Sequence, residues 1–168
     1  GLAVIGGDGL QLLPAAAGLR QRDLLQLRLQ AVSAQGGWPA DEALRPLWER
    51  IGAQDLVFAI GDGFEDGFIH LLTRLSAARR DVTFAQLLTA DERDFPFANG
   101  HRFIDPETGQ ELLGDGRALR AGYLQRFAET QAQLHARLQS AAVSVTTAFV
   151  DQPIDTALQA MYGGRGPR

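Results

Sequence analysis

The side chains best placed to do chemistry in this sequence lie in one short glycine-rich segment, residues 61–67 (Gly-Asp-Gly-Phe-Glu-Asp-Gly). An apolar run at 56–60 precedes the segment and predicts a buried strand, and an amphipathic stretch after it predicts a helix. In open parallel sheets, ligands bind at the carboxyl ends of the strands. Residues 61–67 are therefore a candidate binding loop, with Asp62 close behind the strand.

Three kinds of chemistry were weighed for this loop. Phosphate binding is disfavoured because Asp62, Glu65 and Asp66 would face the phosphate, and like charges about 5 Å apart repel by about 3 kcal/mol at an effective dielectric of about 20. Cation binding is open, because carboxylates at a strand end suit a hard ion such as Mg²⁺. A structural role is the favoured interpretation because it alone explains the acids, and it is compatible with cation binding: Asp62 would cap the helix, and Glu65 and Asp66 would favour the positive end of its dipole.

The sequence contains few signs of catalytic machinery. It has no Gly-x-Ser-x-Gly elbow, no Walker loop and no His-Glu-x-x-His motif. It has no cysteine, which excludes thiolate catalysis, disulfides and cysteine-bound zinc. The three histidines, His70, His101 and His135, stand far apart and are interpreted as surface or half-buried side chains.

Charge and composition narrow the class of partner. The 168 residues carry a net charge of −4, whereas nucleic acids and anionic membranes favour a basic face. No apolar run approaches the roughly 18 residues of a membrane span. We therefore expect a cytoplasmic protein that binds no nucleic acid and does not insert into a membrane through this segment.

The first third of the sequence predicts a hairpin followed by helices. Short apolar runs at 2–5 and 10–13 flank a glycine-rich turn, which is typical of paired strands. Residues 19–32 have helical periodicity, with Leu25, Leu29 and Val32 on one face. Asp41 is expected to cap a second, short helix in which Pro46 falls near the middle.

The rest of the sequence predicts a parallel sheet with one long excursion. Continuous apolar runs at 56–60 and 82–88, joined by a helix that includes Phe64 and Phe68, form one βαβ unit whose first strand should be covered on both faces. Residues 89–116 are polar and predict a hairpin with arms at 101–104 and 111–113 and its turn at 105–109. Then follow a long helix at 117–139, a strand at 143–149, and a last helix with Ile154, Leu158 and Met161 facing inward. We expect one domain over 1–162 and a flexible tail at 163–168.

Longer stretches of the sequence resemble a known bacterial family. The segments LVFAIGDGFED, RRDVTFAQLLTADERDFPF, FIDPETGQELLGD and RAGYLQRF are similar to domain-of-unknown-function family fifty-eight, most specifically from Leu87 to Tyr123. That family is von Willebrand A-like and commonly accompanies MoxR-type AAA+ ATPases. The resemblance implies an α/β fold with a Rossmann-type, mostly parallel sheet flanked by helices. It also implies that the first, central strand is missing here, that the natural protein continues before Gly1, and that this chain alone is marginally stable.

The resemblance further implies a metal-ion-dependent adhesion site built from three loops. An Asp-x-Ser-x-Ser loop after the missing strand has no counterpart in this chain. A second loop should supply a threonine near Gly36-Gly37, where Trp38 follows instead. The third loop supplies an aspartate, matched by Asp62. The resemblance therefore implies a degenerate or incomplete site here, and a site for Mg²⁺ or Mn²⁺ in the full-length protein with Asp62 as a ligand.

Three functions follow from these patterns. The leading one is a non-enzymatic protein-interaction module that acts with a MoxR-type AAA+ ATPase in assembly or maturation of another complex, as the resemblance implies. The alternative is a doubly wound enzyme, nucleotide-binding or hydrolytic, which would need a phosphate loop or a nucleophile. A third is a metal-free scaffold that binds partners through residues 89–116, since long excursions often carry function.

Overall fold

The computed structural model describes residues 1–7, 9–33, 36–98, 100–104 and 111–162. The chain separates into two compact units, Gly1–Gly52 and Ala53–Arg168, and each is described by itself. The predicted tail at 163–168 and hairpin turn at 105–109 lie outside the described residues. The single domain predicted over 1–162 stays a prediction.

The unit Gly1–Gly52 is a hairpin followed by helices. Its elements are β1 (Leu2–Gly6), β2 (Gly9–Leu13), α1 (Leu19–Gln30), the 3₁₀ helix η1 (Asp41–Leu44) and α2 (Arg45–Arg50). The two strands pair antiparallel from Leu2↔Leu13 to Gly6↔Gly9, which confirms the predicted hairpin.

Three predictions in this unit are wrong in detail. Asp41 is the first residue of η1 and does not cap it; Ala40 occupies the capping position. Pro46 lies in the first turn of α2, where its missing N–H has no helical partner to lose, because α2 begins only at Arg45. Leu29 and Val32, predicted to share one face of a helix over 19–32, are exposed, and Val32 lies beyond the end of α1 at Gln30.

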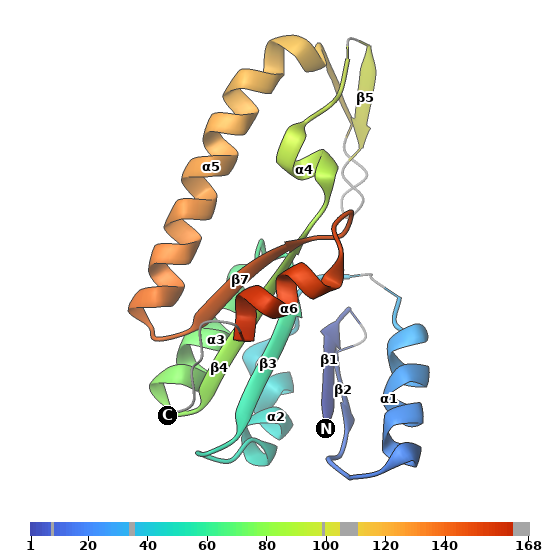
Figure 1. Ribbon diagram of the computed structural model, residues 1–168, viewed down its shortest axis with the longest axis vertical. Coiled ribbons are helices and arrows are strands. Elements are labelled where there is room, and N and C mark those ends of the chain that lie inside the picture. Colours follow the sequence, from blue (N-terminus) through green and yellow to red (C-terminus); the bar gives the residue numbers. More distant parts are fainter. Residues whose placement is uncertain (8, 34–35, 99, 105–110, 163–168) are drawn as a thin grey trace. The chain divides into compact units, whose positions relative to one another are not determined.

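The unit Ala53–Arg168 is an α/β structure with a three-stranded parallel sheet (Figure 1). Its elements are β3 (Leu56–Gly61), α3 (Asp66–Ala77), β4 (Asp81–Leu88), α4 (Ala90–Asp94), β5 (His101–Ile104), β6 (Glu111–Gly114), α5 (Gly116–Ser140), β7 (Ser144–Phe149) and α6 (Ile154–Tyr162). The strand order is β3-β4-β7, with both neighbours parallel to β4. This confirms the predicted βαβ unit and the flanking of the sheet by helices.

Helices cover the two faces of this sheet unequally. The helices α3 and α5 lie on one face and α6 lies on the other (Figure 1). On the α3 and α5 side the core is fully apolar except for one residue, and it contains Val82, Phe84 and Leu88 from β4, Ile69, Leu72 and Leu75 from α3, and Leu138 from α5. Phe68 meets Phe84 edge-on with ring centroids 5.3 Å apart. The exception in this core is the polar residue Gln86, which is 0% exposed.

The continuous apolar run of β3 predicts a strand buried on both faces, and this prediction is wrong. Strand β3 lies at the edge of the sheet, and among the described residues of its unit only β4 pairs with it. Leu56, Phe58 and Ile60 point to one face and are 57%, 42% and 57% exposed. A continuous apolar run predicts what a strand needs to have covered, and it does not show that the cover is present.

The last helix also differs from its prediction. Ile154 and Leu158, expected to face inward, are exposed, and Ala157 is the buried residue of α6. Helix α6 packs on β7, and the small Ala157 side chain permits this close approach.

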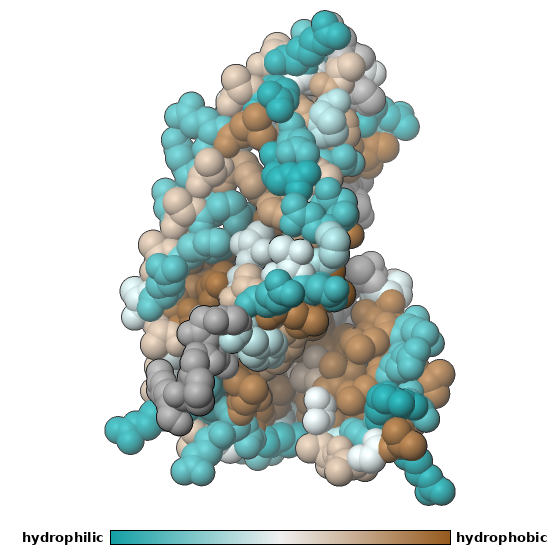
Figure 2. All heavy atoms as spheres, viewed as in Figure 1, coloured by the Kyte–Doolittle hydropathy of each residue, from teal (hydrophilic) through white to brown (hydrophobic). Residues whose placement is uncertain are grey.

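The excursion between β4 and α5 forms a small lobe against the first half of α5. The strands β5 and β6 pair antiparallel from His101↔Gly114 to Ile104↔Glu111, as predicted. An aromatic cluster fixes the lobe: Phe95 stacks on Tyr123 with centroids 4.4 Å apart, and Phe97 and Phe103 meet Phe95 at 5.0 and 5.6 Å. The outer surface of this region is largely hydrophilic (Figure 2).

Candidate functional site

Asp62 lies in the turn that connects β3 to α3, at the carboxyl end of the sheet, as the sequence predicts. Its carboxylate is exposed and accepts a hydrogen bond from the Phe64 N–H at 2.9 Å. The prediction that Asp62 caps the helix is wrong: Glu65 is the capping residue, and its side chain accepts from the Gly67 N–H at 3.5 Å. Phe64 precedes the helix and is exposed. Asp62 therefore closes a local turn and leaves its second carboxylate oxygen directed at solvent.

Gly63 is the buried point of this loop. Its φ is +82°, a left-handed conformation that glycine adopts without steric cost. A Cβ atom at this position would lie 3.0 Å from Leu134 Cδ2 and 3.3 Å from Phe84 Cζ. The loop is thus held down on α5 and β4 at the residue next to Asp62.

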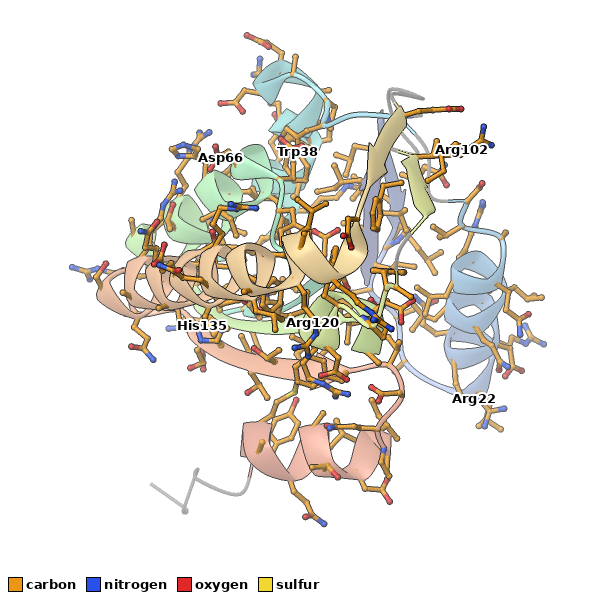
Figure 3. The ribbon with its side chains drawn as sticks, turned by 90° about the horizontal axis from the view of Figure 1, so that it is seen from above. Arg22, Trp38, Asp66, Arg102, Arg120 and His135 are labelled. Carbon is orange, nitrogen blue, oxygen red and sulfur yellow. The ribbon has the colours of Figure 1, made fainter. Side chains whose placement is uncertain are left out.

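A polar cluster lies beneath the loop and is formed by Gln86 on β4, His135 on α5 and Thr147 on β7. Gln86 Nε2 donates to the Asp62 carbonyl oxygen at 2.8 Å. Gln86 Oε1 accepts from Thr147 Oγ1 at 3.1 Å. His135 Nε2 lies 3.2 Å from both Gln86 Oε1 and Thr147 Oγ1, and Figure 3 shows His135 on the side of α5 that faces β7. One buried amide thus connects the main chain of Asp62 to two neighbouring elements.

Counting donors and acceptors indicates which tautomer of His135 suits this cluster. The amide oxygen of Gln86 can only accept, and the Thr147 hydroxyl has one hydrogen to donate. All the contacts are satisfied when Thr147 directs that hydrogen at Gln86 and His135 Nε2 carries a hydrogen of its own. In that arrangement His135 cannot act as a general base for Thr147, because Nε2, the nitrogen near the hydroxyl, already carries a hydrogen.

One of the other acids of the loop, Asp66, has a basic neighbour. Asp66 forms an ion pair with Arg137 of α5 at 3.3 Å. This pair borders an open groove of about 290 Å³, which is also lined by Gly63, Phe64 and Leu134. Among the described residues no cation forms an ion pair with Asp62. Asp62 and Glu65 are therefore the loop carboxylates without a cationic partner in the described part of the structure, and both are exposed to an outside partner.

The chain beyond β4 and β7 adds a second charged cluster at the same end of the sheet. Arg93 bonds Asp94 at 2.7 Å and Asp151 at 3.4 Å, and its guanidinium lies 4.7 Å from the centre of the Phe149 ring. The hydrogen bond to Asp94 raises the pKa of Arg93, and the same bond lowers the pKa of Asp94. Arg93 is half-buried and bridges two exposed carboxylates, which suits a tether between α4 and the turn after β7.

The residues present form at most part of a metal site. Within the described ranges no group of three or more histidine, aspartate or glutamate side chains could hold a metal ion. Asp62 offers one free carboxylate oxygen to such an ion, and further ligands would have to come from elsewhere. Trp38, which stands where a threonine ligand was expected, lies in the other unit and is half-buried.

Sequence reasoning missed the polar cluster beneath the loop. It placed His135 among unconnected histidines and treated 82–88 as an apolar strand. A signal was present, because a glutamine inside such a strand is buried and must then find hydrogen-bond partners. His70, by contrast, is exposed, as expected, and the side chain of His101 lies outside the described part of the structure.

Comparison with known proteins adds no relative to this picture. No protein-family model matches the chain, and neither a curated protein nor a solved structure does. Among the described residues, no helix is long and apolar enough to cross a membrane.

Proposed function

We propose that this chain is a non-enzymatic protein-interaction module of the von Willebrand A type, which works with a MoxR-type AAA+ ATPase in assembly or maturation of a protein complex. The type and the ATPase rest on the sequence resemblance. The observation that supports a binding role is the edge strand β3, which among the described residues of its unit pairs only with β4 and whose Leu56, Phe58 and Ile60 are exposed.

Two features support a binding role for this surface. Exposed strand edges in stable proteins carry lysine, proline, a bulge or an inward charge that prevents pairing, and the sequence of β3 (LVFAIG) has none of these. Its exposed side chains are also large and adjacent on one face, whereas isolated apolar residues are the ordinary case on a protein surface. The register pairs Phe58 with Thr83 and Ile60 with Ala85, and both partners on β4 are buried. The cover of this face therefore stops at β4.

Asp62 extends the proposed surface at the carboxyl end of β3. Its free carboxylate oxygen suits a basic side chain of a partner, or a Mg²⁺ or Mn²⁺ ion completed by ligands from outside the described residues. A module of this kind binds by apolar contact along β3 and is oriented by charge at its end.

The test is the affinity of the chain for a MoxR-type AAA+ ATPase from the same organism, measured by biolayer interferometry. Phe58→Arg should weaken binding about tenfold or more, because it places a charge in the middle of the apolar face. Val150→Arg is the matched control: Val150 is also exposed, but it follows β7 and lies off β3, so this variant should bind like the parent. Equal losses in both variants, or no binding by the parent, would overturn the proposal.

The role of Asp62 is tested by calorimetric titration with Mg²⁺ and Mn²⁺. Binding that disappears in Asp62→Asn supports a cation site at the strand end. If neither ion binds but Asp62→Asn weakens binding of the ATPase, Asp62 contacts the partner directly. If Asp62→Asn changes neither measurement, Asp62 is outside the binding surface.

A further inference from the structure

We propose that Gln86 is a positioning residue for Asp62: its amide, held by His135 and Thr147, fixes the loop that presents the Asp62 carboxylate at the carboxyl end of β3. Gln86 touches no ligand in this proposal and acts only through the main chain of Asp62. The consequence for binding rests on the function proposed above, whereas the effect on the loop does not.

The first argument is the burial of Gln86. It is 0% exposed and lies between Phe84 and Leu88 on the core face of the central strand. An apolar side chain of similar size would fill this place without the cost of removing an amide from water. The cost is offset only because both ends of the amide are bonded, one of them to the Asp62 carbonyl oxygen at 2.8 Å.

The second argument is the direction of the amide. A glutamine amide can turn so that either its oxygen or its nitrogen faces a given group, and only the nitrogen can bond a carbonyl. Thr147 Oγ1 at 3.1 Å and His135 Nε2 at 3.2 Å are both placed to bond Gln86 Oε1. These two contacts from β7 and α5 hold the oxygen on their side and leave Nε2 for Asp62.

The third argument is that the loop has few other restraints around Asp62. Among the described residues, the Asp62 side chain bonds only within the turn, to the Phe64 N–H. Gly63 packs on Leu134 and Phe84, which fixes one side of the turn. On the other side Gly61 ends β3 and pairs with Gln86 in the sheet, and the Gln86 amide adds a bond to the main chain of Asp62 itself. Loss of this bond should loosen the turn at Asp62 without unfolding the sheet.

The experiment is backbone ¹⁵N relaxation over residues 61–65 in the whole chain. Gln86→Met keeps the length and burial of the side chain and removes every hydrogen bond. In the parent the order parameters of Asp62 and Phe64 should be about 0.85, and in Gln86→Met they should fall below about 0.6, with β4 and α3 unchanged. Thr147→Val removes one restraint on the amide and should give a smaller fall. Adding it to Gln86→Met should change nothing further, because Thr147 acts through Gln86.

If Gln86→Met does not fold, a second variant can be used for the same measurement. Thr147→Val combined with His135→Leu leaves Gln86 in place and frees its amide to turn, so it should loosen Asp62 and Phe64 in the same way. Unchanged order parameters in these variants, or a fall spread evenly over β4 and α3, would overturn the positioning role. If the loop loosens but the ATPase binds the variants as tightly as the parent, the positioning role stands and the binding role proposed for Asp62 fails.

Discussion

Substitution of Gly63 by alanine tests how tightly the candidate loop packs on its neighbours. In Gly63→Ala the new Cβ meets Leu134 and Phe84 and also makes the left-handed backbone unfavourable. The strain costs about 1 kcal/mol. The contact adds about 1–2 kcal/mol because the core must shift. We expect the free energy of unfolding to fall by about 2–3 kcal/mol, measured by urea denaturation.

Gly100→Ala is the matched control for this prediction. Gly100 has nearly the same backbone angle, with φ of +79°, but a Cβ atom there would meet nothing within 4 Å. This variant should lose only the strain component, about 1 kcal/mol. Equal losses in the two variants would mean that Gly63 is required for its backbone angle alone and that the loop is not packed against α5.

Tyr123 ties the excursion lobe to the long helix at the level of whole elements. Its hydroxyl donates to the Glu92 carbonyl oxygen at 3.0 Å, and its ring stacks on Phe95. Burial raises the pKa of Tyr123, and the negative charge of Glu92 raises it further. Because the folded pKa lies above the unfolded value of about 10, this group stabilises the fold below pH 10, and the contribution is lost as the pH rises through the folded pKa.

This link predicts an alkaline loosening of the lobe. The chain has two tyrosines, so Tyr162→Phe leaves Tyr123 as the only one, and its ionisation can be followed by absorbance near 295 nm. We expect a midpoint above pH 10, together with loss of the near-ultraviolet circular dichroism of the aromatic cluster. A midpoint at or below pH 10, or one reached with the cluster signal intact, would show that Tyr123 does not hold the lobe in place.

At the scale of elements, the local sequence patterns predicted the helices and strands well but predicted poorly which of their faces are covered. The hairpins at 2–13 and 101–114, the βαβ unit and the long helix follow from periodicity and turn residues, and the structure contains them. The cover of β3 and the inward face of α6 were predicted wrongly, since periodicity shows which side chains need burial and not which elements supply it.

In the candidate site, too, one part could be predicted from the sequence and another part could not. Asp62 could be placed at a strand end from sequence, because a strand-loop-helix pattern fixes where the carboxyl end lies. Its supporting residues could not, because Gln86, His135 and Thr147 come from three elements and meet only through the register of β4 with β7 and the rotation of α5. Register and helix rotation depend on packing over the whole sheet, which no local window contains.

At the scale of the whole molecule, the two units differ in how much core they have. In Gly1–Gly52 the buried apolar side chains among the described residues are Leu44 and Leu47, and the polar Gln21 is buried with them. The unit Ala53–Arg168 buries a continuous set from α3, β4, α5 and β7. Small units bury too little surface to be stable alone. We therefore predict that Gly1–Gly52 unfolds at a lower urea concentration than Ala53–Arg168.

The chain carries its own probes for this prediction. Both tryptophans, Trp38 and Trp48, lie in Gly1–Gly52, so tryptophan fluorescence reports on that unit alone. The longest helix, α5, lies in the other unit together with α3 and α6, so circular dichroism at 222 nm reports mainly on that one. We expect the fluorescence transition to precede the dichroism transition, which two-state unfolding forbids. Leu47→Ala should move only the fluorescence midpoint and Leu72→Ala only the dichroism midpoint. Coincident transitions that both variants shift equally would mean that the two units unfold as one cooperative structure, and that the small core of Gly1–Gly52 is completed by contacts beyond it.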